Sequence, residues 1–426
     1  MSIFKKAALF TAAAMCTGCL SACASTNCGE DVSVTAESIS ETTVSTAAVP
    51  PEEQAHLDMV HKSFVSPGNS YRLRQKLKQI EDGKETTVAF IGGSITEGYT
   101  VQPDQCYAKL TYDMLAKGHT DTVKYVNAGI SGTPSILGNL RLQRDVISQE
   151  ADIVFVEFAV NDGGETMYQE SYDSLVKTLL EQKNEPAVIL LLNRTKEGHT
   201  APDYLKEIGN HYELPMISTA DALTWALDNG HIQWEDYYND SSHPSPEGHK
   251  LFLEFIEYAF FMLHAESTIP ESYELKPLGR HGAPYENAVL AEADYDNSDS
   301  NLQITDIGAF DKSAGGLSGF RKGWAFNPDS QGGAFKFTVT GNSLFLVCHR
   351  NKTDNMGKLD VYINGAKIKT IDLKDPNGWG DPFAYQVIKW QSVKTMEIEV
   401  RPAEGYEDKL TEILAIGYTC NDSVTF

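Results

Sequence analysis

The chain has 426 residues. One hydrophobic core of average size does not organise a chain of this length, so the length favours two domains with extensions. Its 35 Lys and Arg residues against 59 Asp and Glu residues give a net charge of −24 at pH 7. This acidity argues against phosphate-rich ligands, so we expect no nucleic-acid partner, and it is otherwise typical of a well-solvated protein.

The N-terminus has the pattern of an export signal. Lys5 and Lys6 precede an apolar run over residues 7–15 that is too short to span a membrane permanently. The sequence LSAC, which ends at Cys23, resembles the lipobox of bacterial lipoproteins, in which the cysteine is acylated and begins the mature chain. The resemblance implies a signal peptide over residues 1–22, a lipid anchor at Cys23, and an exported protein held at the cell surface. The alternative is an ordinary secretory signal.

The next part of the chain changes from a tether to a regular α/β pattern. Residues 23–55 are rich in Ser, Thr, Ala and Glu, which predicts a flexible tether. Over residues 56–268, β-rich runs alternate with helix-like segments, which predicts a parallel sheet covered by helices on both faces. The expected strands are 87–91, 123–127, 153–158, 187–192 and 215–218. The expected helices are 107–117, 138–148, 168–182, 202–212 and one that begins after Ser245 and Pro246.

Beyond residue 271 the pattern changes to short alternating runs. Turn signals separate them, notably Asn364-Gly365 and Asn377-Gly378. We therefore predict an all-β sandwich as an accessory domain over residues 271–426. The runs lie at 334–339, 344–348, 359–363, 368–373 and 396–400.

The cysteines beyond the predicted anchor are few and widely spaced. Export permits a disulfide, for which Cys348 and Cys420 are the candidate pair, and free buried thiols are an equal alternative. The predicted mature chain has no CxxC pair and no His/Cys cluster with zinc-site spacing. We therefore expect neither a structural metal nor a cofactor.

Four polar blocks stand at the ends of predicted elements. Ser94 follows two glycines between a buried strand and a helix, where a nucleophile would be exposed, although the same residues also cap helices. Segment 127–132 (Asn-Ala-Gly-Ile-Ser-Gly) and Asn161 each follow a later strand. Asp240 and His243 share one loop, and their spacing of three lets the carboxylate accept from one ring nitrogen while the other faces a hydroxyl.

In this order, the four blocks resemble the SGNH branch of the GDSL esterase and lipase superfamily, over about residues 86–264. The resemblance implies a three-layer α/β/α fold with a mainly parallel, flavodoxin-like sheet. It implies Ser94 as nucleophile and His243 as base, with Asp240 as the partner of His243. It further implies an oxyanion hole formed by Ser94, Gly132 and Asn161.

Three positions leave details of the resemblance open. Gly129 is a rival to Gly132 for the oxyanion glycine. Gly93 and Ala159 stand where many members of the superfamily have Asp and Gly, respectively. Neither departure removes a group that performs chemistry, but both leave the subfamily and the substrate class open.

An exported, tethered esterase with a β-rich companion domain points to a polymer outside the cell. We expect a serine carboxylic ester hydrolase that removes acetyl groups from a polysaccharide or oligosaccharide through an acyl-enzyme. The alternatives are a lipase, lysophospholipase or thioesterase, and, in another class, a non-catalytic carbohydrate-binding surface lipoprotein.

Aromatic residues supply candidate substrate contacts. Trp324 and Trp379 in the predicted β domain would stack on sugar rings if exposed, and burial in the sandwich is the alternative. Trp234, Tyr237 and Tyr238 precede the histidine loop, where they would either line a pocket or pack in the core.

Overall fold

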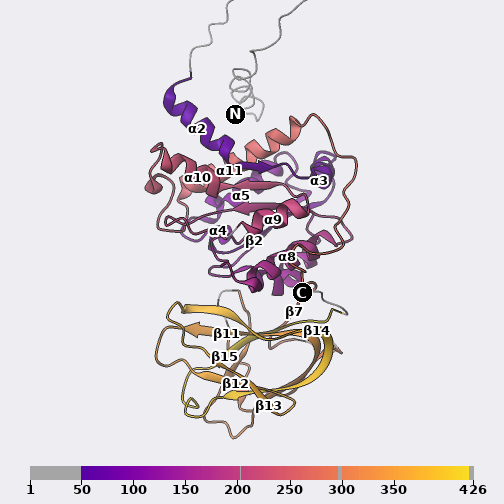
Figure 1. The fold of residues 1–426 in the computed structure, drawn as a ribbon, viewed down its shortest axis with the longest axis vertical. Coiled ribbons are helices and arrows are strands. Elements are labelled where there is room, and N and C mark those ends of the chain that lie inside the picture. Colours follow the sequence, from indigo (N-terminus) through magenta and orange to yellow (C-terminus); the bar gives the residue numbers. More distant parts are fainter. Residues whose placement is uncertain (1–48, 202, 296–299, 316, 318, 422–426) are drawn as a thin grey trace, which may run out of the picture.

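The computed structural model describes residues 49–421, apart from residues 202, 296–299, 316 and 318. The predicted signal peptide, the Cys23 anchor and most of the predicted tether lie outside the described residues. The described chain forms an α/β domain and a β domain, which are stacked along the long axis of the molecule (Figure 1).

The α/β domain is built on a six-stranded sheet with the order β1-β6-β5-β4-β2-β3. The five strands β2 to β6 are parallel, and β1 pairs antiparallel with β6 at one edge. Numbered among themselves, the parallel strands run 2-1-3-4-5, so the predicted flavodoxin-like sheet is confirmed. The strands are β1 (Phe64–Ser66), β2 (Thr86–Gly92), β3 (Val123–Gly129), β4 (Ile153–Glu157), β5 (Ala187–Leu192) and β6 (Met216–Ser218).

Helices cover both faces of this sheet, as predicted. Alternate residues of one strand enter different cores: Phe90 of β2 belongs to one buried cluster and Ile91 to another. Both are fully buried, which explains why the central strands are almost continuously apolar. The helices are α2 (Pro51–Lys62), α3 (Tyr71–Glu81), α4 (Ser94–Glu97), η1 (Pro103–Gln105), α5 (Tyr107–Leu115), α6 (Ser135–Leu140), α7 (Leu142–Asp145), η2 (Ile147–Gln149), α8 (Thr166–Leu180), α9 (Tyr204–His211), α10 (Thr219–Asp228), η3 (Trp234–Asp236) and α11 (Pro246–His264).

Two sequence-based expectations for helices are wrong. Helix α2 begins at Pro51, so residues 51–55 are helical and do not belong to a flexible tether. Proline in the first turn, followed by acidic residues, favours a helix start there.

The helix expected at 138–148 is broken into α6, α7 and η2, with Arg141 at the first junction. The fully buried Arg141 guanidinium donates to the carbonyl oxygens of Gly92 and Ala128, so the break ties the ends of β2 and β3 together.

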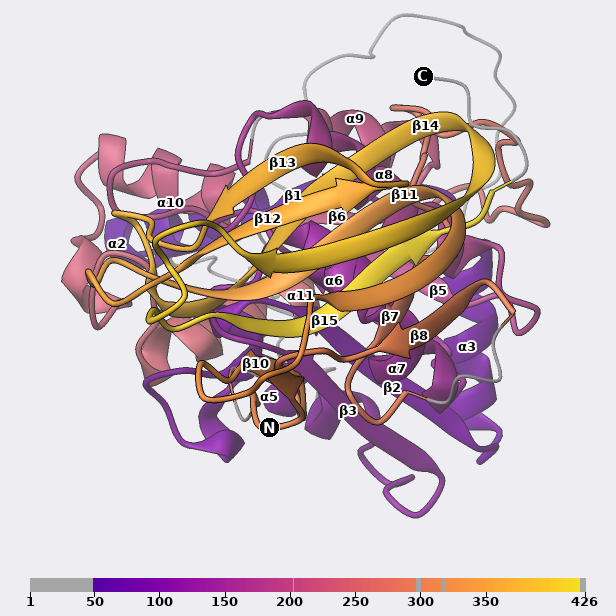
Figure 2. The same cartoon turned by 90° about the horizontal axis from the view of Figure 1, so that it is seen from below.

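The β domain is a nine-stranded antiparallel sheet that curls around its own core (Figure 2). The two long strands β11 and β14 pair along most of their lengths, and different halves of β11 pair with β8 and β15. One cluster collects the inward side chains of both halves, so the two layers of the predicted sandwich belong to one hydrogen-bonded sheet. The strands are β7 (Val289–Ala291), β8 (Leu302–Asp306), β9 (Phe310–Asp311), β10 (Trp324–Phe326), β11 (Phe335–Asn351), β12 (Lys358–Ile363), β13 (Ala366–Asp372), β14 (Trp379–Pro402) and β15 (Glu412–Thr419).

The predicted turn at Asn364-Gly365 is confirmed as the loop between β12 and β13. Both residues have positive φ, 49° for Asn364 and 80° for Gly365, as a two-residue hairpin loop of this kind requires. Asparagine and glycine adopt that conformation at little cost, which is why the dipeptide is a reliable signal.

Cys348 forms no disulfide with Cys420, so the candidate pair is wrong and the buried-thiol alternative holds for Cys348. Cys348 pairs with Ile413 at one end of β15, whereas Cys420 follows Thr419 at the other end. At about 3.3 Å per residue the two lie roughly 20 Å apart along the strand, far beyond the reach of a disulfide.

The two domains share an apolar interface. Around it, Lys389 of β14 bonds both carboxylate oxygens of Glu170 in α8, at 2.6 and 2.8 Å. Gln386 donates to the Tyr285 hydroxyl at 2.6 Å, and that hydroxyl donates to Glu170 at 3.1 Å. The shared cluster includes Ile136, Leu137 and Leu140 of α6 together with Phe345, Val347, Ala384, Leu414 and Ala415 of the β domain.

Candidate active site

The nucleophile candidate Ser94 lies in a tight turn at the carboxyl end of β2. A Cβ on Gly92 would lie 2.2 Å from Thr96 Oγ1, and a Cβ on Gly93 would lie 2.1 Å from Asn161 Oδ1. Any side chain at either glycine would therefore push apart the groups around the turn.

The structure brings Ser94, His243 and Asp240 into one hydrogen-bonded line. His243 Nε2 lies 2.9 Å from Ser94 Oγ, and His243 Nδ1 lies 2.8 Å from Asp240 Oδ2. Ser94 is 8% exposed, so its surroundings are mostly desolvated. The three side chains have the mutual geometry of a nucleophile, its base and the group that orients the base.

The loop that carries Asp240 and His243 is held by its own hydrogen bonds. Asp240 Oδ1 accepts the backbone N–H groups of Ser242 and His243, each at 2.8 Å. Desolvation by burial would raise the pKa of Asp240, but the hydrogen bonds from His243 and from these two N–H groups hold that pKa below its ordinary value. Asp240 therefore stays ionised beside the imidazole.

Aromatic residues before this loop support it from the core. Trp234 and Tyr238 are buried and stacked, with ring centroids 3.8 Å apart. Trp234 Nε1 also donates to the Asp240 backbone oxygen at 2.7 Å. Of the two roles considered for these residues, core packing is therefore correct. Tyr237 lines a separate cavity, described below.

Gly132 is the better candidate of the two possible oxyanion glycines. In the loop after β3, the N–H of Gly129 donates to Asn127 Oδ1 at 2.9 Å. The N–H groups of Ile130, Ser131 and Thr133 also donate within the protein. Gly132, with φ of 71°, is the remaining N–H donor among the described residues of this short loop.

Asn161 follows β4 and lies beside the nucleophile turn. Its Oδ1 is buried against Gly93 and, within the described part of the chain, has no hydrogen-bond partner. Its neighbour Asp162 is buried and accepts the Ser135 backbone N–H at the start of α6, at 2.7 Å. Burial raises the pKa of Asp162 to about 7.

The β domain contributes one wall of the site through Trp379. A Cβ on Gly132 would lie 2.4 Å from Trp379 Cζ2, so the indole ring rests on this glycine, although Trp379 is 55% exposed. At the triad itself, the exposed Tyr99 ring lies 4.9 Å from the His243 ring, centre to centre. Trp324 is fully buried, so a sugar contact by Trp324 is excluded, as the alternative of core burial required.

One further group at the site was missed in the sequence. Glu157, the last residue of β4, is fully buried beneath the nucleophile turn. The signal that could have revealed it is a lone carboxylate at the end of an otherwise apolar strand. Such a group must be hydrogen-bonded from several sides to be retained there.

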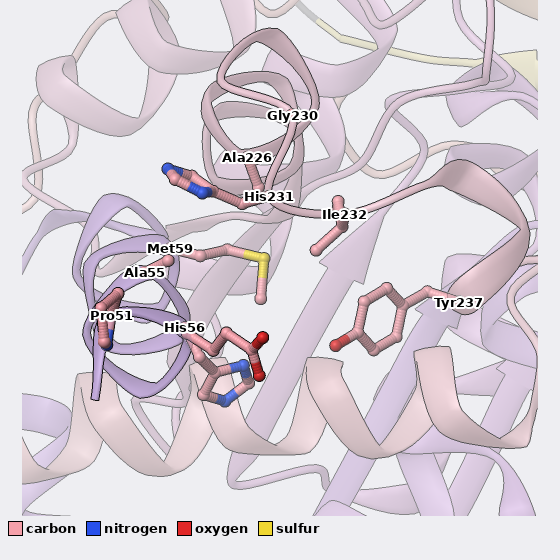
Figure 3. A pocket seen from close by; sticks show the side chains of 10 residues that line it. Pro51, Ala55, His56, Met59, Ala226, Gly230, His231, Ile232 and Tyr237 are labelled. Atoms are coloured by element: carbon pink, nitrogen blue, oxygen red, sulfur yellow. The ribbon is translucent and has the colours of Figure 1, made fainter. Parts of the chain in front are cut away.

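Other features of the α/β domain lie apart from these residues. A cavity of about 480 Å³ lies between α2 and the segment after α10, and His56, His231 and Tyr237 are among its lining residues (Figure 3). None of the triad or oxyanion candidates lines it.

Over the described ranges, no cluster of His, Cys, Asp or Glu could hold a metal ion, and no helix is both long and apolar enough to cross a membrane.

Comparison with known proteins identifies the class of the α/β domain. Residues 90–251 match the model of the GDSL-like Lipase/Acylhydrolase family, so the α/β domain is similar to the hydrolases of that family. A search of curated proteins gives no match.

The whole architecture is shared with a solved enzyme. The structure of a two-domain esterase (CEX) active on acetylated mannans is 24% identical, has a TM-score of 0.74, and covers 85% of this chain and 99% of its own. The same esterase co-crystallised with mannopentaose is also 24% identical, with a TM-score of 0.72 and coverage of 85% and 98%. The combination of a GDSL-like domain and a C-terminal β domain is therefore a known fold.

Proposed function

We propose that the protein removes acetyl groups from carbohydrates, with Ser94 as nucleophile, His243 as general base and Asp240 as the group that orients His243. The observation that carries this proposal is the hydrogen-bonded line from Asp240 through His243 to Ser94, with distances of 2.8 and 2.9 Å. Such a line is the arrangement that activates a serine hydroxyl.

The reaction follows from the protons along this line. His243 Nε2 takes the Ser94 hydroxyl proton while Oγ attacks the ester carbonyl, and Asp240 stabilises the imidazolium that forms. The imidazolium then protonates the departing sugar oxygen, which leaves an acetyl-enzyme. Water, deprotonated by the same imidazole, releases acetate and restores Ser94.

The oxyanion formed in each step requires donors around it. The backbone N–H groups of Ser94 and Gly132 and the amide of Asn161 are the proposed donors. The engaged N–H groups of the neighbouring loop residues support Gly132 over Gly129. Removal of one such donor typically costs about 2.7–4 kcal/mol of transition-state stabilisation.

Two observations favour an acetylated carbohydrate as the substrate. The two-domain esterase that shares this architecture acts on acetylated mannans. The exposed Tyr99 ring lies beside His243 and the exposed Trp379 ring beside Gly132, where flat apolar surfaces would stack on sugar rings. A lipase, lysophospholipase or thioesterase on the same scaffold would require a site for a long acyl chain.

The proposed location is the outer surface of the cell membrane. The lipobox-like sequence before Cys23 supports acylation of that cysteine, and export would bring the enzyme to polymers outside the cell. Metabolic labelling with a fatty-acid analogue should mark the wild-type chain and not the variant Cys23→Ala.

The enzymatic proposal is tested by comparing wild type with Ser94→Ala on p-nitrophenyl acetate, on p-nitrophenyl esters of longer acids and on a panel of acetylated glycans. We expect release of acetate from glycans, which Ser94→Ala abolishes. A preference for long acyl chains would reject deacetylation in favour of a lipase. Glycan binding without any serine-dependent hydrolysis would identify a non-catalytic binding protein.

A further inference from the structure

Glu157 lies beneath the nucleophile turn, within hydrogen-bonding distance of it. Strands β2 and β4 are adjacent, and Gly92 and Glu157 are register partners at their carboxyl ends. The fully buried Glu157 carboxyl accepts a hydrogen bond from Thr96 Oγ1 at 3.2 Å and another from the backbone N–H of Gly93. These two donors lie on either side of Ser94 in the sequence, so one carboxyl holds both ends of the turn.

A second layer of hydrogen bonds fixes the direction of these contacts. The Tyr107 hydroxyl lies 2.9 Å from Thr96 Oγ1, so a proton on Tyr107 can point to Thr96 while Thr96 donates to Glu157. On the other side, Thr219 Oγ1 donates to Asn193 Oδ1 at 2.5 Å, which leaves Asn193 Nδ2 to face the carboxyl. In the described structure Asn193 Nδ2 and Glu157 Oε1 are both buried, and neither has a hydrogen-bond partner at this geometry.

The causes that set the pKa of Glu157 are its burial and three hydrogen bonds, with no ion pair among them. The ionisable groups whose pKa the Glu157 charge raises are all acids or neutral side chains. They lie just before α5, in α5, in the loop after β4, in α8 and in the segment after η3. Burial raises the pKa of Glu157 to about 7, and the hydrogen bonds from Asn193, Thr96 and Gly93 oppose that rise. The ionisable groups concerned are Cys106, Tyr107, Asp162, Tyr172 and Tyr238.

We propose that Glu157 is a positioning residue of the esterase: as a carboxylate it holds Gly93 and Thr96, and it thereby fixes the backbone N–H and hydroxyl of Ser94 for attack. The inference rests on the proposed role of Ser94. The carboxylate is the acting form because it accepts from both Thr96 and Gly93, whereas a protonated carboxyl would turn its own proton toward one of them.

The experiment uses Thr96 to separate positioning from folding. Thr96→Val removes only the hydroxyl that links Glu157 to the turn, and Thr96→Ser keeps it. We expect kcat on p-nitrophenyl acetate to fall about 10- to 100-fold in Thr96→Val with KM nearly unchanged, because small displacements of a nucleophile have effects of that size. We expect Thr96→Ser to retain most of the wild-type kcat.

Glu157→Gln tests the carboxylate itself through the pH profile. His243 must be neutral to act as a base, and Glu157 must be ionised to hold the turn, so the acidic limb of kcat/KM in wild type should contain two ionisations. Glu157→Gln should lower kcat and leave one ionisation.

Asp173→Asn is the matched control, because this buried carboxylate accepts from the Tyr212 hydroxyl at 2.8 Å and from the His281 backbone N–H at 2.6 Å, away from the turn. It should lower the melting temperature and keep both ionisations.

Two outcomes would overturn the inference. One is equal kcat in Thr96→Val and Thr96→Ser, and the other is an unchanged acidic limb in folded Glu157→Gln. Either result would leave the role of Ser94 intact as long as Ser94→Ala is inactive. Full activity of Ser94→Ala would instead reject the proposed function itself, so the two failures are distinguishable.

Discussion

Trp379 rests on Gly132: its Cζ2 atom lies 2.4 Å from the position that a Cβ on the glycine would occupy. The β domain therefore forms part of the wall beside the proposed oxyanion hole, and the indole ring that does so is 55% exposed.

Trp379→Ala should weaken the use of glycans more than the use of small esters. Loss of one stacked ring is expected to raise KM for an acetylated oligosaccharide about three- to tenfold, which corresponds to roughly 0.7–1.4 kcal/mol. The kinetics on p-nitrophenyl acetate should change little. The matched control is Ile368→Ala, which removes another exposed apolar side chain of the β domain. Equal effects of both variants on glycan KM would contradict a specific role for Trp379.

Gly132→Ala should nearly abolish activity for two separable reasons. Its φ of 71° is unfavourable for alanine, and the added methyl group would collide with Trp379. We expect kcat on p-nitrophenyl acetate to fall by about 10² or more, as on loss of an oxyanion donor. The double variant Gly132→Ala/Trp379→Ala should recover part of this loss, because only the collision is relieved. No recovery would mean that the backbone conformation alone sets the cost.

Asp240→Asn should reduce kcat strongly while the protein remains folded. The amide cannot stabilise the imidazolium, and it favours the wrong tautomer of His243, a change that costs up to about 10⁴ in comparable triads. Asp240 is at the surface, with a side chain 47% exposed, so the melting temperature should change little. Activity within threefold of wild type would show that His243 acts without this carboxylate.

The stability of wild type should fall as the pH rises through neutrality. The pKa of Glu157 is raised from 4.5 to about 7 in the folded state, so the folded protein holds a proton that the unfolded chain releases. The favourable contribution is complete below about pH 4.5 and is lost as the pH rises to about 7, by about 3 kcal/mol. Urea unfolding of wild type and Glu157→Gln at pH 5 and 8 measures this, since Gln removes that part of the pH dependence. Parallel curves for the two proteins would contradict the buried, protonatable carboxyl.

The sequence predicted those features that depend on local pattern. Continuous apolar runs such as the one that ends at Ile91 mark strands buried on both faces, and Asn364-Gly365 marks a hairpin because its conformation is intrinsic to the two residues. The order of the polar blocks predicted which side chains meet at one sheet edge. Parallel strands bring their carboxyl ends together, so Ser94 and Asn161 become neighbours through topology alone.

Features that depend on contacts between distant segments were not predictable in this way. Trp324 and Trp379 both stand beside glycines in the sequence, yet one is in the β-domain core and the other at the active site. Their positions depend on how the long β strands curl and on how the two domains pack. The role of Glu157 was not predicted from the sequence because Thr96 and Asn193 follow other strands and form no recognisable sequence motif with it.

The shared cluster around α6 means that the β domain is not a detachable module. Leu140 packs so closely on β15 that a Cβ on Gly417 would lie 2.7 Å from it, and α6 begins three residues after Gly132. Truncation before the β domain would expose this apolar helix face to water and free the loop before it. The two domains are therefore expected to unfold as one cooperative unit, with a single transition on heating.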